Sequence, residues 1–342
     1  MQAGQTRYPP TAGTAALRPA IADKAGVAAA NVIVATGAKQ VLADMFLATL
    51  NQGDEVIVPT PYWTSYSDII ALSGGEALLL RCGADAGFKM TPEQLEATIT
   101  PRTRWVLLNS PSNPTGAVYT AKELAALGAV LARYPHVWIA SDEIYDLICY
   151  APFTSFCNAC PDLADRTIII NGVSKAHAMT GWRIGWAIAP TELIQAMIAV
   201  QGQITSGACS ISQAAALEAV TGDQSHITER LDAFRDRRDF VVDALNAIPG
   251  FTCSVPDGAL YVFPSCEAVL GLRTPDGARL ETDTDFCAYV IATTGLAIVP
   301  GRAFGLPGHF RLSYAYARAS LEDGCARLTR AVQGLASNQR TA

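Results

Sequence analysis

One lysine stands out among the residues that could carry chemistry. The chain of 342 residues holds only five lysines, and Lys175 lies in the stretch NGVSKAHAMTGWRIGW, directly after the apolar run RTIII. It follows Ser174 and precedes Arg183 by eight residues. An amine that follows a buried strand meets apolar walls and loses hydration, and such an amine can act as a nucleophile. The position therefore predicts a reactive lysine rather than a surface charge.

Other apolar runs are also followed by polar or aromatic residues. In open α/β sheets, ligands bind at the carboxyl ends of the strands, so these residues are expected to share one site. They are Gly37, Ala38 and Lys39 after VIVAT, Trp63 after EVIVPTP, Asn113 after WVLLNSPS, and Asp142 with Tyr145 in VWIASDEIY. The first three open a helix, whose free N–H groups can hold a phosphate.

Pyridoxal 5′-phosphate is a ligand that uses all of these groups. Its aldehyde needs a lysine, its ring nitrogen a carboxylate, its phenolic oxygen a hydrogen-bond donor, and its phosphate needs hydroxyls and an arginine. Asp142 would keep the ring nitrogen protonated, which makes the ring an electron sink. The residues therefore predict a pyridoxal-phosphate site.

Alternating strands and helices must position these residues. The runs NVIVAT, DEVIVPT, EALLLRC, TRWVLLNS, HVWIASD and RTIIIN are typical of buried strands, and IGWAIAP adds a seventh. Amphipathic segments such as AKQVLADMFLATLNQGD and TAKELAALGAVLARYP lie between them. This order predicts an α/β fold with a mostly parallel seven-stranded sheet. We place this large domain at residues 1–230 and a smaller α+β domain at residues 231–342.

The composition narrows the class of protein further. The net charge of −6 argues against nucleic acid as a ligand. Half of the residues are apolar and only 16% are charged, which suggests that a partner subunit covers some apolar surface. No apolar run reaches the roughly 20 residues that span a bilayer. The nine cysteines are dispersed, and the CxxC of Cys157 and Cys160 has no second ligand pair. We expect a cytoplasmic protein without a metal or a membrane partner.

Seven segments, in order along nearly the whole chain, resemble one family. They are YPPTAGTAALRPAIA, ATGAKQVLADMFLATLNQGDEVIVPTPYWTSY, NSPSNPTGAVY, SDEIYDLICY, NGVSKAHAMTGWRIGW, PDGALYVFP and FRLSYA. The chain resembles the class I aminotransferases, which are pyridoxal-phosphate enzymes of fold type I, and within them the bacterial aspartate aminotransferase subgroup.

The resemblance implies a role for each matching residue at the cofactor. Lys175 resembles the Schiff-base lysine and Asp142 the partner of the pyridinium nitrogen. Asn113 and Tyr145 resemble the partners of the phenolic oxygen, and Trp63 the residue stacked on the ring. The implied phosphate contacts are Ser174, Arg183 and the backbone amides of Ala38 and Lys39, after Gly37.

The resemblance also implies substrate contacts and a partner. Arg311 in FRLSYA matches the arginine that binds the substrate α-carboxylate, with Asn113 and Trp63 beside it. Lys39 matches a lysine associated with the distal carboxylate of dicarboxylic substrates, and phosphate neutralisation is its alternative role. Tyr8 resembles the tyrosine that reaches the phosphate of the neighbouring subunit, which implies a homodimer with shared active sites.

These matches predict an aminotransferase that moves an amino group between an L-amino acid and a 2-oxo acid. Aspartate or another dicarboxylic amino acid and 2-oxoglutarate are the expected substrates. Two alternatives stay open: a pyridoxal-phosphate β-elimination lyase, and a truncated pseudoenzyme that binds the cofactor without turnover. Relatives carry several dozen residues before the position of Tyr8, so we expect a shortened N-terminus, natural or from a late start, with weaker substrate closure. His177 is interpreted as a packing residue.

Overall fold

The computed structural model describes residue 4 and residues 6–338. Seven strands form one sheet in the order β1-β7-β6-β5-β4-β2-β3. They are β1 (Val32–Ala35), β2 (Glu55–Thr60), β3 (Glu76–Arg81), β4 (Thr103–Asn109), β5 (Trp138–Asp142), β6 (Thr167–Gly172) and β7 (Gly185–Ile188). The strand β7 runs antiparallel to both of its neighbours, β1 and β6, and the other strand pairs of this sheet are parallel. The seven predicted strands and the mostly parallel sheet are confirmed.

The strand β3 differs from the prediction of a fully buried run. It lies at the edge of the sheet and pairs with β2 alone. All of its residues are exposed or partly exposed, and the side chain of Leu79 is half exposed. EALLLRC is apolar enough for a central strand, but its charged ends, Glu76 and Arg81, are exposed to solvent, which suits an edge.

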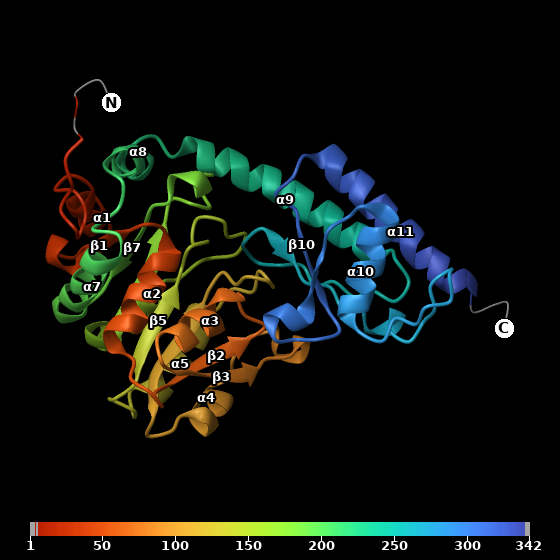
Figure 1. Cartoon of the computed structure of the whole chain (residues 1–342), viewed down its shortest axis with the longest axis horizontal. Coiled ribbons are helices and arrows are strands. Elements are labelled where there is room, and N and C mark those ends of the chain that lie inside the picture. Colours follow the sequence, from red (N-terminus) through yellow and green to blue (C-terminus); the bar gives the residue numbers. More distant parts are fainter. Residues whose placement is uncertain (1–3, 5, 339–342) are drawn as a thin grey trace.

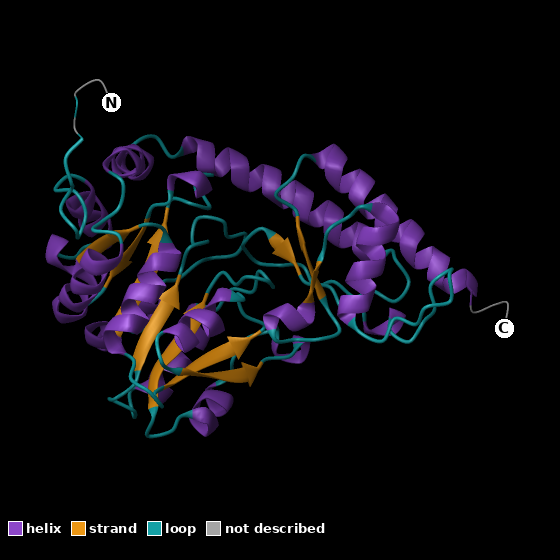
Figure 2. Cartoon of the chain, viewed as in Figure 1, coloured by secondary structure: helices purple, strands orange, loops and turns teal. Residues whose placement is uncertain are grey.

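Helices cover both faces of this sheet, as Figure 2 shows. The first face packs against α2 (Ala38–Thr49), α3 (Ser65–Leu72) and α7 (Thr191–Ile204). The opposite face packs against α4 (Pro92–Thr98), α5 (Ala121–Leu131) and α6 (Phe156–Ala159), and beside β1 and β7 against α1 (Leu17–Ala25) and α8 (Ser210–Thr221). Strand residues alternate between these cores because their side chains alternate in direction. Val56 and Val58 face one core, and Ile57 faces the other.

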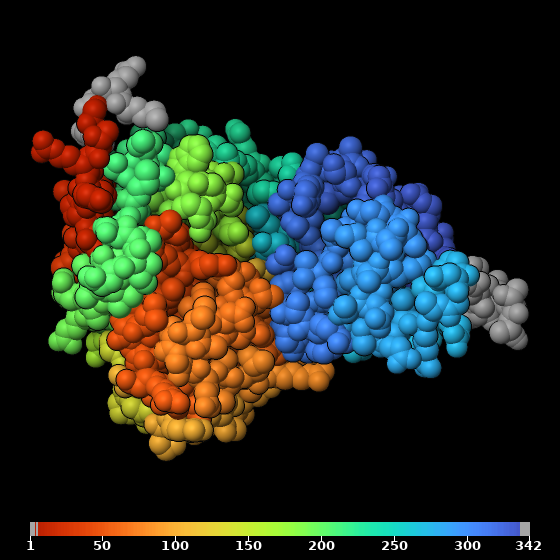
Figure 3. Space-filling view, viewed as in Figure 1, coloured from red at the N-terminus to blue at the C-terminus, as the bar shows by residue number. Residues whose placement is uncertain are grey.

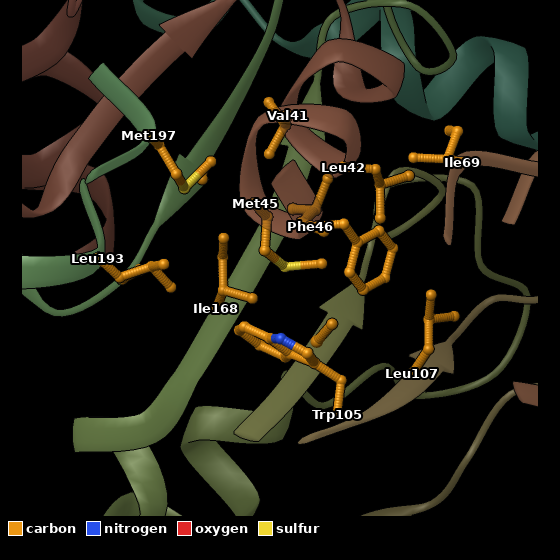
Figure 4. Packing of buried hydrophobic residues seen from close by; sticks show 14 of the residues in the cluster. Val41, Leu42, Met45, Phe46, Ile69, Trp105, Leu107, Ile168, Leu193 and Met197 are labelled. Carbon is orange, nitrogen blue, oxygen red and sulfur yellow. The ribbon is translucent and has the colours of Figure 1, made fainter. Parts of the chain in front are cut away.

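The helix α2 packs tightly against the large sheet. Val41, Leu42, Met45 and Phe46 recur at helical spacing and are fully buried against the sheet (Figure 4). The ring of Phe46 meets that of Trp105 edge to face at 6.3 Å, and the Trp105 indole donates a hydrogen bond of 3.0 Å to Thr49. This packing fixes the helix whose first turn faces the site.

The C-terminal part has its own sheet and core. The sheet has the order β8-β10-β9, with β8 (Tyr261–Val262), β9 (Val299–Pro300) and β10 (Phe310–Ser313). It packs with α9 (Ser225–Asn246), α10 (Asp283–Thr294) and α11 (Arg318–Asn338). In Figure 1, α9 extends from α8 to α11, and in Figure 3 the blue C-terminal part forms a lobe of its own.

Three helices, α7, α8 and α9, follow one another between Thr191 and Asn246. After them, the segment FTCSVPDGALYVF contains only the two-residue strand β8, since its Pro256 and Gly258 disfavour a longer strand. The domain boundary at residue 230 falls inside α9 and stays a prediction. None of the helices in the described chain is long and apolar enough to cross a bilayer.

Candidate active site

Most of the predicted residues line a single cavity of about 400 Å³. It opens at the carboxyl ends of β4 and β5 and is closed on one side by the smaller sheet. The predicted residues in its lining are Ala38, Lys39, Trp63, Asn113, Asp142, Tyr145, Ser174, Lys175, Arg183 and Arg311. Residues that are far apart in the sequence therefore meet where the strand-end argument places them.

Asp142 is the buried carboxylate of this cavity. It ends β5 and is only 3% exposed. Its Oδ2 accepts a hydrogen bond of 2.7 Å from the Tyr66 hydroxyl, and its Oδ1 accepts one of 3.2 Å from the Ile144 amide. Burial raises the pKa of Asp142, while the two hydrogen bonds and the charge of Lys175 oppose that shift. A cationic ring nitrogen beside this carboxyl would favour its ionised form.

Lys175 follows β6 and lies beside Tyr145. Its Nζ is 5.5 Å from the centroid of the Tyr145 ring. Trp63 supplies the aromatic face of the cavity and meets Tyr66 edge to face at 5.4 Å. Lys39 also lines the cavity, and its Nζ is 4.9 Å from the centroid of the Trp63 ring. Two lysines therefore line the cavity.

The start of α2 forms a cradle of hydrogen-bond donors with Arg183. Gly37 is its N-cap, with φ +84°, and the first amides of Ala38 and Lys39 follow. A Cβ on Gly37 would lie 2.5 Å from the Arg183 guanidinium, so only glycine lets the arginine approach this turn. Buried Ser174 completes the lining. Helix N–H groups, a guanidinium and a hydroxyl are the donors that a phosphate requires.

Arg311 reaches the cavity from the smaller sheet. Its Nη1 donates a hydrogen bond of 2.9 Å to the Asn113 side-chain oxygen. Its guanidinium lies over the rings of Tyr261, at 4.5 Å, and Phe304, at 4.9 Å. An arginine whose plane is held in this way presents a fixed fork to a carboxylate.

Sequence reasoning missed five residues that also line the cavity, which are Tyr66, Asn109, Ile144, Thr180 and Tyr261. Asn109 is the last residue of β4, so the strand-end rule could have found it. Tyr66 lies in the first turn of α3, three residues after Trp63, and its amide donates a hydrogen bond of 3.0 Å to the Trp63 carbonyl. Tyr261 comes from β8, and no local spacing relates it to Tyr145.

Two singled-out residues lie outside this cavity. Tyr8 is 91% exposed and does not line it within its own chain. His177 packs near His226, with ring centroids 5.9 Å apart, and burial followed by the charge of His226 lowers its pKa to about 4. It borders a larger cavity, of about 580 Å³, between α1, β6 and β7. None of the predicted cofactor residues lines that larger cavity, so the smaller cavity is the candidate active site.

The residues of the smaller cavity fit pyridoxal 5′-phosphate. The cradle at Gly37 would hold the phosphate, the buried carboxyl of Asp142 would face the ring nitrogen, and Lys175 would offer an amine to the aldehyde. The fold and the cavity together define a pyridoxal-phosphate enzyme of fold type I.

Comparisons with known proteins agree with this class. Residues 1–328 match the family model "Aminotransferase class I and II". The chain is 52% identical to "Aspartate aminotransferase" of Rhizobium meliloti over 97% of this chain and 83% of the relative. It is 48% identical to "Aspartate/prephenate aminotransferase" of Cereibacter sphaeroides over 98% of this chain and 86% of the relative.

Solved structures give the same answer. The crystal structure of the Rhizobium meliloti aspartate aminotransferase superposes with a TM-score of 0.95 at 51% identity, over 98% of this chain and 86% of that one. The Thermus thermophilus aspartate aminotransferase with maleate gives 0.89 at 36% identity, over 96% and 85%. The chain therefore belongs to the class I and II aminotransferase family, whose members use pyridoxal 5′-phosphate. The predicted fold type, enzyme class and cofactor are confirmed.

Proposed function

We propose that this aminotransferase moves the amino group of aspartate, or of another dicarboxylic amino acid, to a 2-oxo acid such as 2-oxoglutarate. The observation that carries the proposal is the pair of cations in one cavity, Arg311 and Lys39. Arg311 is oriented by Asn113 and two aromatic rings to bind an α-carboxylate. Lys39 is then available for the distal carboxylate.

The cofactor contacts follow from the same lining. Asp142 would pair with the ring nitrogen, and Tyr145 with Asn113 would bind the phenolic oxygen. Trp63 would stack on the ring, and the cradle of Gly37, Ala38, Lys39, Ser174 and Arg183 would hold the phosphate. When bound, the cofactor supplies an electron-withdrawing ring that stabilises negative charge at the substrate Cα.

The side chains of the cavity would perform the remaining work. Arg311 and Lys39 bind the two carboxylates of the substrate and fix the direction of its Cα–H bond. Lys175 Nζ would remove the proton from the substrate Cα as general base and, as general acid, would donate a proton at a different atom in the next step. Tyr145, beside Lys175, keeps the amine near the reacting carbon.

The names of two relatives favour the dicarboxylic substrates. One is called an aspartate and another an aspartate/prephenate aminotransferase. Both named compounds carry two carboxylates, which suits a cavity with two cations. A panel of amino donors with and without 2-oxoglutarate tests the proposal. Keto acid that forms only with the acceptor supports transamination. Keto acid without acceptor would indicate β-elimination, and cofactor binding with no product would indicate a pseudoenzyme.

We also propose a homodimer in which Tyr8 of the partner subunit completes the phosphate site. The segment that follows Tyr8 is anchored to α8, because the Thr14 amide donates a hydrogen bond of 2.7 Å to the Gln213 side chain. Ile204 and Ile211, at neighbouring ends of α7 and α8, are more than half exposed. Apolar surface next to an anchored, exposed tyrosine is suited to a subunit interface.

A cytoplasmic location is proposed on the basis of the thiols. All nine cysteines are free, and six of them are buried. Free buried thiols are typical of proteins from a reducing compartment. Secretion in an active, disulfide-bonded form, detected by thiol labelling, would contradict the proposal.

A further inference from the structure

We propose that Tyr261 is a positioning residue that holds the substrate-binding Arg311 through its ring and the cofactor-facing Tyr145 through its hydroxyl. Tyr261 lies in β8 of the smaller sheet, and Tyr145 lies in the turn that follows β5 of the large sheet, so one side chain would join both halves of the site. The inference rests on the proposed function, because it assigns Arg311 to the substrate and Tyr145 to the cofactor.

The strand register explains the contact with Arg311. Ser313 of β10 pairs with Tyr261 of β8, and Arg311 is two residues before Ser313. Side chains two residues apart on a strand share a face, so Arg311 is the diagonal neighbour of Tyr261. The guanidinium carbon is 4.5 Å from the centroid of the Tyr261 ring, well inside the range of a cation–π contact.

That contact restricts the guanidinium before the substrate arrives. Phe304 approaches the same group at 4.9 Å, and Asn113 accepts a hydrogen bond from its Nη1. A guanidinium that is already oriented loses less conformational entropy when it binds a carboxylate. Removal of the Tyr261 ring should therefore weaken the binding of any carboxylate at Arg311.

The hydroxyl makes the second contact. The hydroxyl oxygens of Tyr261 and Tyr145 are 3.0 Å apart, and the two rings meet edge to face at 6.0 Å. A phenol has one proton to donate and lone pairs to accept. If Tyr261 donates to Tyr145, the Tyr145 proton stays free for the phenolic oxygen of the cofactor, and the chain of two hydrogen bonds strengthens that donation.

The charged and titratable groups around this phenol favour its protonated form. Burial, followed by Tyr261 and then Asp142, raises the pKa of Tyr145 well above its ordinary value, and Arg311 opposes the shift. Lys175 is the remaining charged neighbour. Tyr145 therefore keeps its proton across the working range of pH, and Tyr261 decides where that proton points.

Two substitutions separate the two contacts. Tyr261→Phe keeps the ring over Arg311 and removes only the hydroxyl, whereas Tyr261→Leu removes both. Tyr150→Phe is the matched control: the Tyr150 hydroxyl lies 3.0 Å from that of Tyr314, and the Arg238 guanidinium lies 4.5 Å from its ring, outside the cavity.

Each variant, loaded with pyridoxal phosphate, is measured in two ways. The first is the pH midpoint of the visible absorbance of the bound cofactor. The second is the dissociation constant of succinate, a dicarboxylate without an amino group, from the shift in thermal unfolding. Tyr261→Phe should raise the pH midpoint by about 0.5 unit and leave succinate affinity within about twofold. Tyr261→Leu should show the same shift and bind succinate roughly tenfold more weakly.

Three results would overturn the proposal. If Tyr261→Phe keeps the wild-type pH midpoint, the hydroxyl of Tyr261 does not position Tyr145. If Tyr261→Leu keeps the wild-type affinity for succinate, the ring of Tyr261 does not position Arg311. Equal changes in Tyr150→Phe would show a general loss of packing. Failure of the proposed function would give a different result, because the wild-type protein would then bind no cofactor or convert no amino acid. The comparison of succinate affinity between the wild-type protein and Tyr261→Leu would still test the role of the Tyr261 ring.

Discussion

The hydroxyl of Tyr66 donates a hydrogen bond of 2.7 Å to the carboxylate of Asp142, and both side chains are almost fully buried. A buried carboxylate is costly unless it is paired. The phenol comes from the first turn of α3, and the Ile144 amide binds the other oxygen. The carboxylate is thus fixed in direction by the protein alone.

Tyr66→Phe should weaken this orientation without removing the charge. We expect a cofactor affinity and a kcat/KM that are each lower by roughly tenfold, since one buried hydrogen bond to a charged group is lost. Loss of the donor also raises the pKa of Asp142 further, because the Tyr66 hydrogen bond lowers it. Tyr119→Phe is the control: Tyr119 is another buried phenol, hydrogen-bonded to the Met90 amide. Unchanged kinetics in Tyr66→Phe would refute the assignment.

Asp142→Ala should have a much larger effect on turnover than on binding. Without a carboxylate the ring nitrogen of the cofactor loses its proton, and kcat should fall on the order of a thousandfold. The phosphate cradle at Gly37 and Arg183 is untouched, so spectroscopic titration should still detect bound cofactor. Near-normal turnover would mean that Asp142 has only a structural part.

Lys175 should be the only lysine that the cofactor labels. The purified protein should be yellow, and borohydride should attach the cofactor to Lys175 irreversibly, as read by peptide mapping. Lys175→Arg should keep the phosphate contacts but give no covalent adduct. Lys39 is the internal comparison, because this lysine also lines the cavity. An adduct on Lys39 or Lys24 would contradict the assignment.

Asp44 should make the stability of the fold depend on pH. It is fully buried in α2, and its oxygens accept no hydrogen bond of normal geometry within the described chain, although Gln40 lies near enough to lower its pKa slightly. Burial raises that pKa from 3.8 to about 7. Between these two pKa values the folded chain keeps a proton on Asp44 that the unfolded chain loses. The contribution of this protonated carboxyl to the free energy of unfolding is therefore fully present below about pH 4 and is lost as the pH rises through about 7.

Asp44→Asn should remove this dependence. At pH 8 we expect the variant to be more stable by roughly 1 to 3 kcal/mol, since the cost of the buried charge exceeds that of an unpaired amide. At pH 4 the two proteins should be alike. Denaturant unfolding at both pH values measures the difference, with the exposed Asp68→Asn as control. A gain of the same size at pH 4 would show that the charge is not its cause.

The sequence patterns predicted most of the fold because buried parallel strands consist of continuous runs of apolar residues. Edge placement of β3 was not predictable from EALLLRC, since the pairing of strands is decided by long-range packing. Site residues that follow a strand, such as Asp142 and Lys175, were within reach of the strand-end rule. Tyr261 was not, because it enters from a second sheet whose docking no local pattern describes.

The proposed dimer leads to a prediction about how two chains share one site. The side chain of Tyr8 is 91% exposed, so it contributes nothing to the cavity of its own chain. If it enters the neighbouring cavity, light scattering should give the mass of two chains. Tyr8→Ala should then weaken cofactor binding by removing a hydrogen bond to the phosphate, an effect of about tenfold.

Mixing two inactive or weakened variants tests the sharing directly. In a heterodimer of Tyr8→Ala and Lys175→Ala, the first chain keeps Lys175 and receives an intact tyrosine from its partner. That site is complete, whereas the other site lacks both groups. Unfolding and refolding the two variants together should therefore restore roughly a quarter of the wild-type activity at cofactor levels where neither variant alone is active, because half of the dimers are mixed and each has one complete site. Activity equal to the average of the separate variants, or an active monomer, would show that Tyr8 serves no neighbouring site.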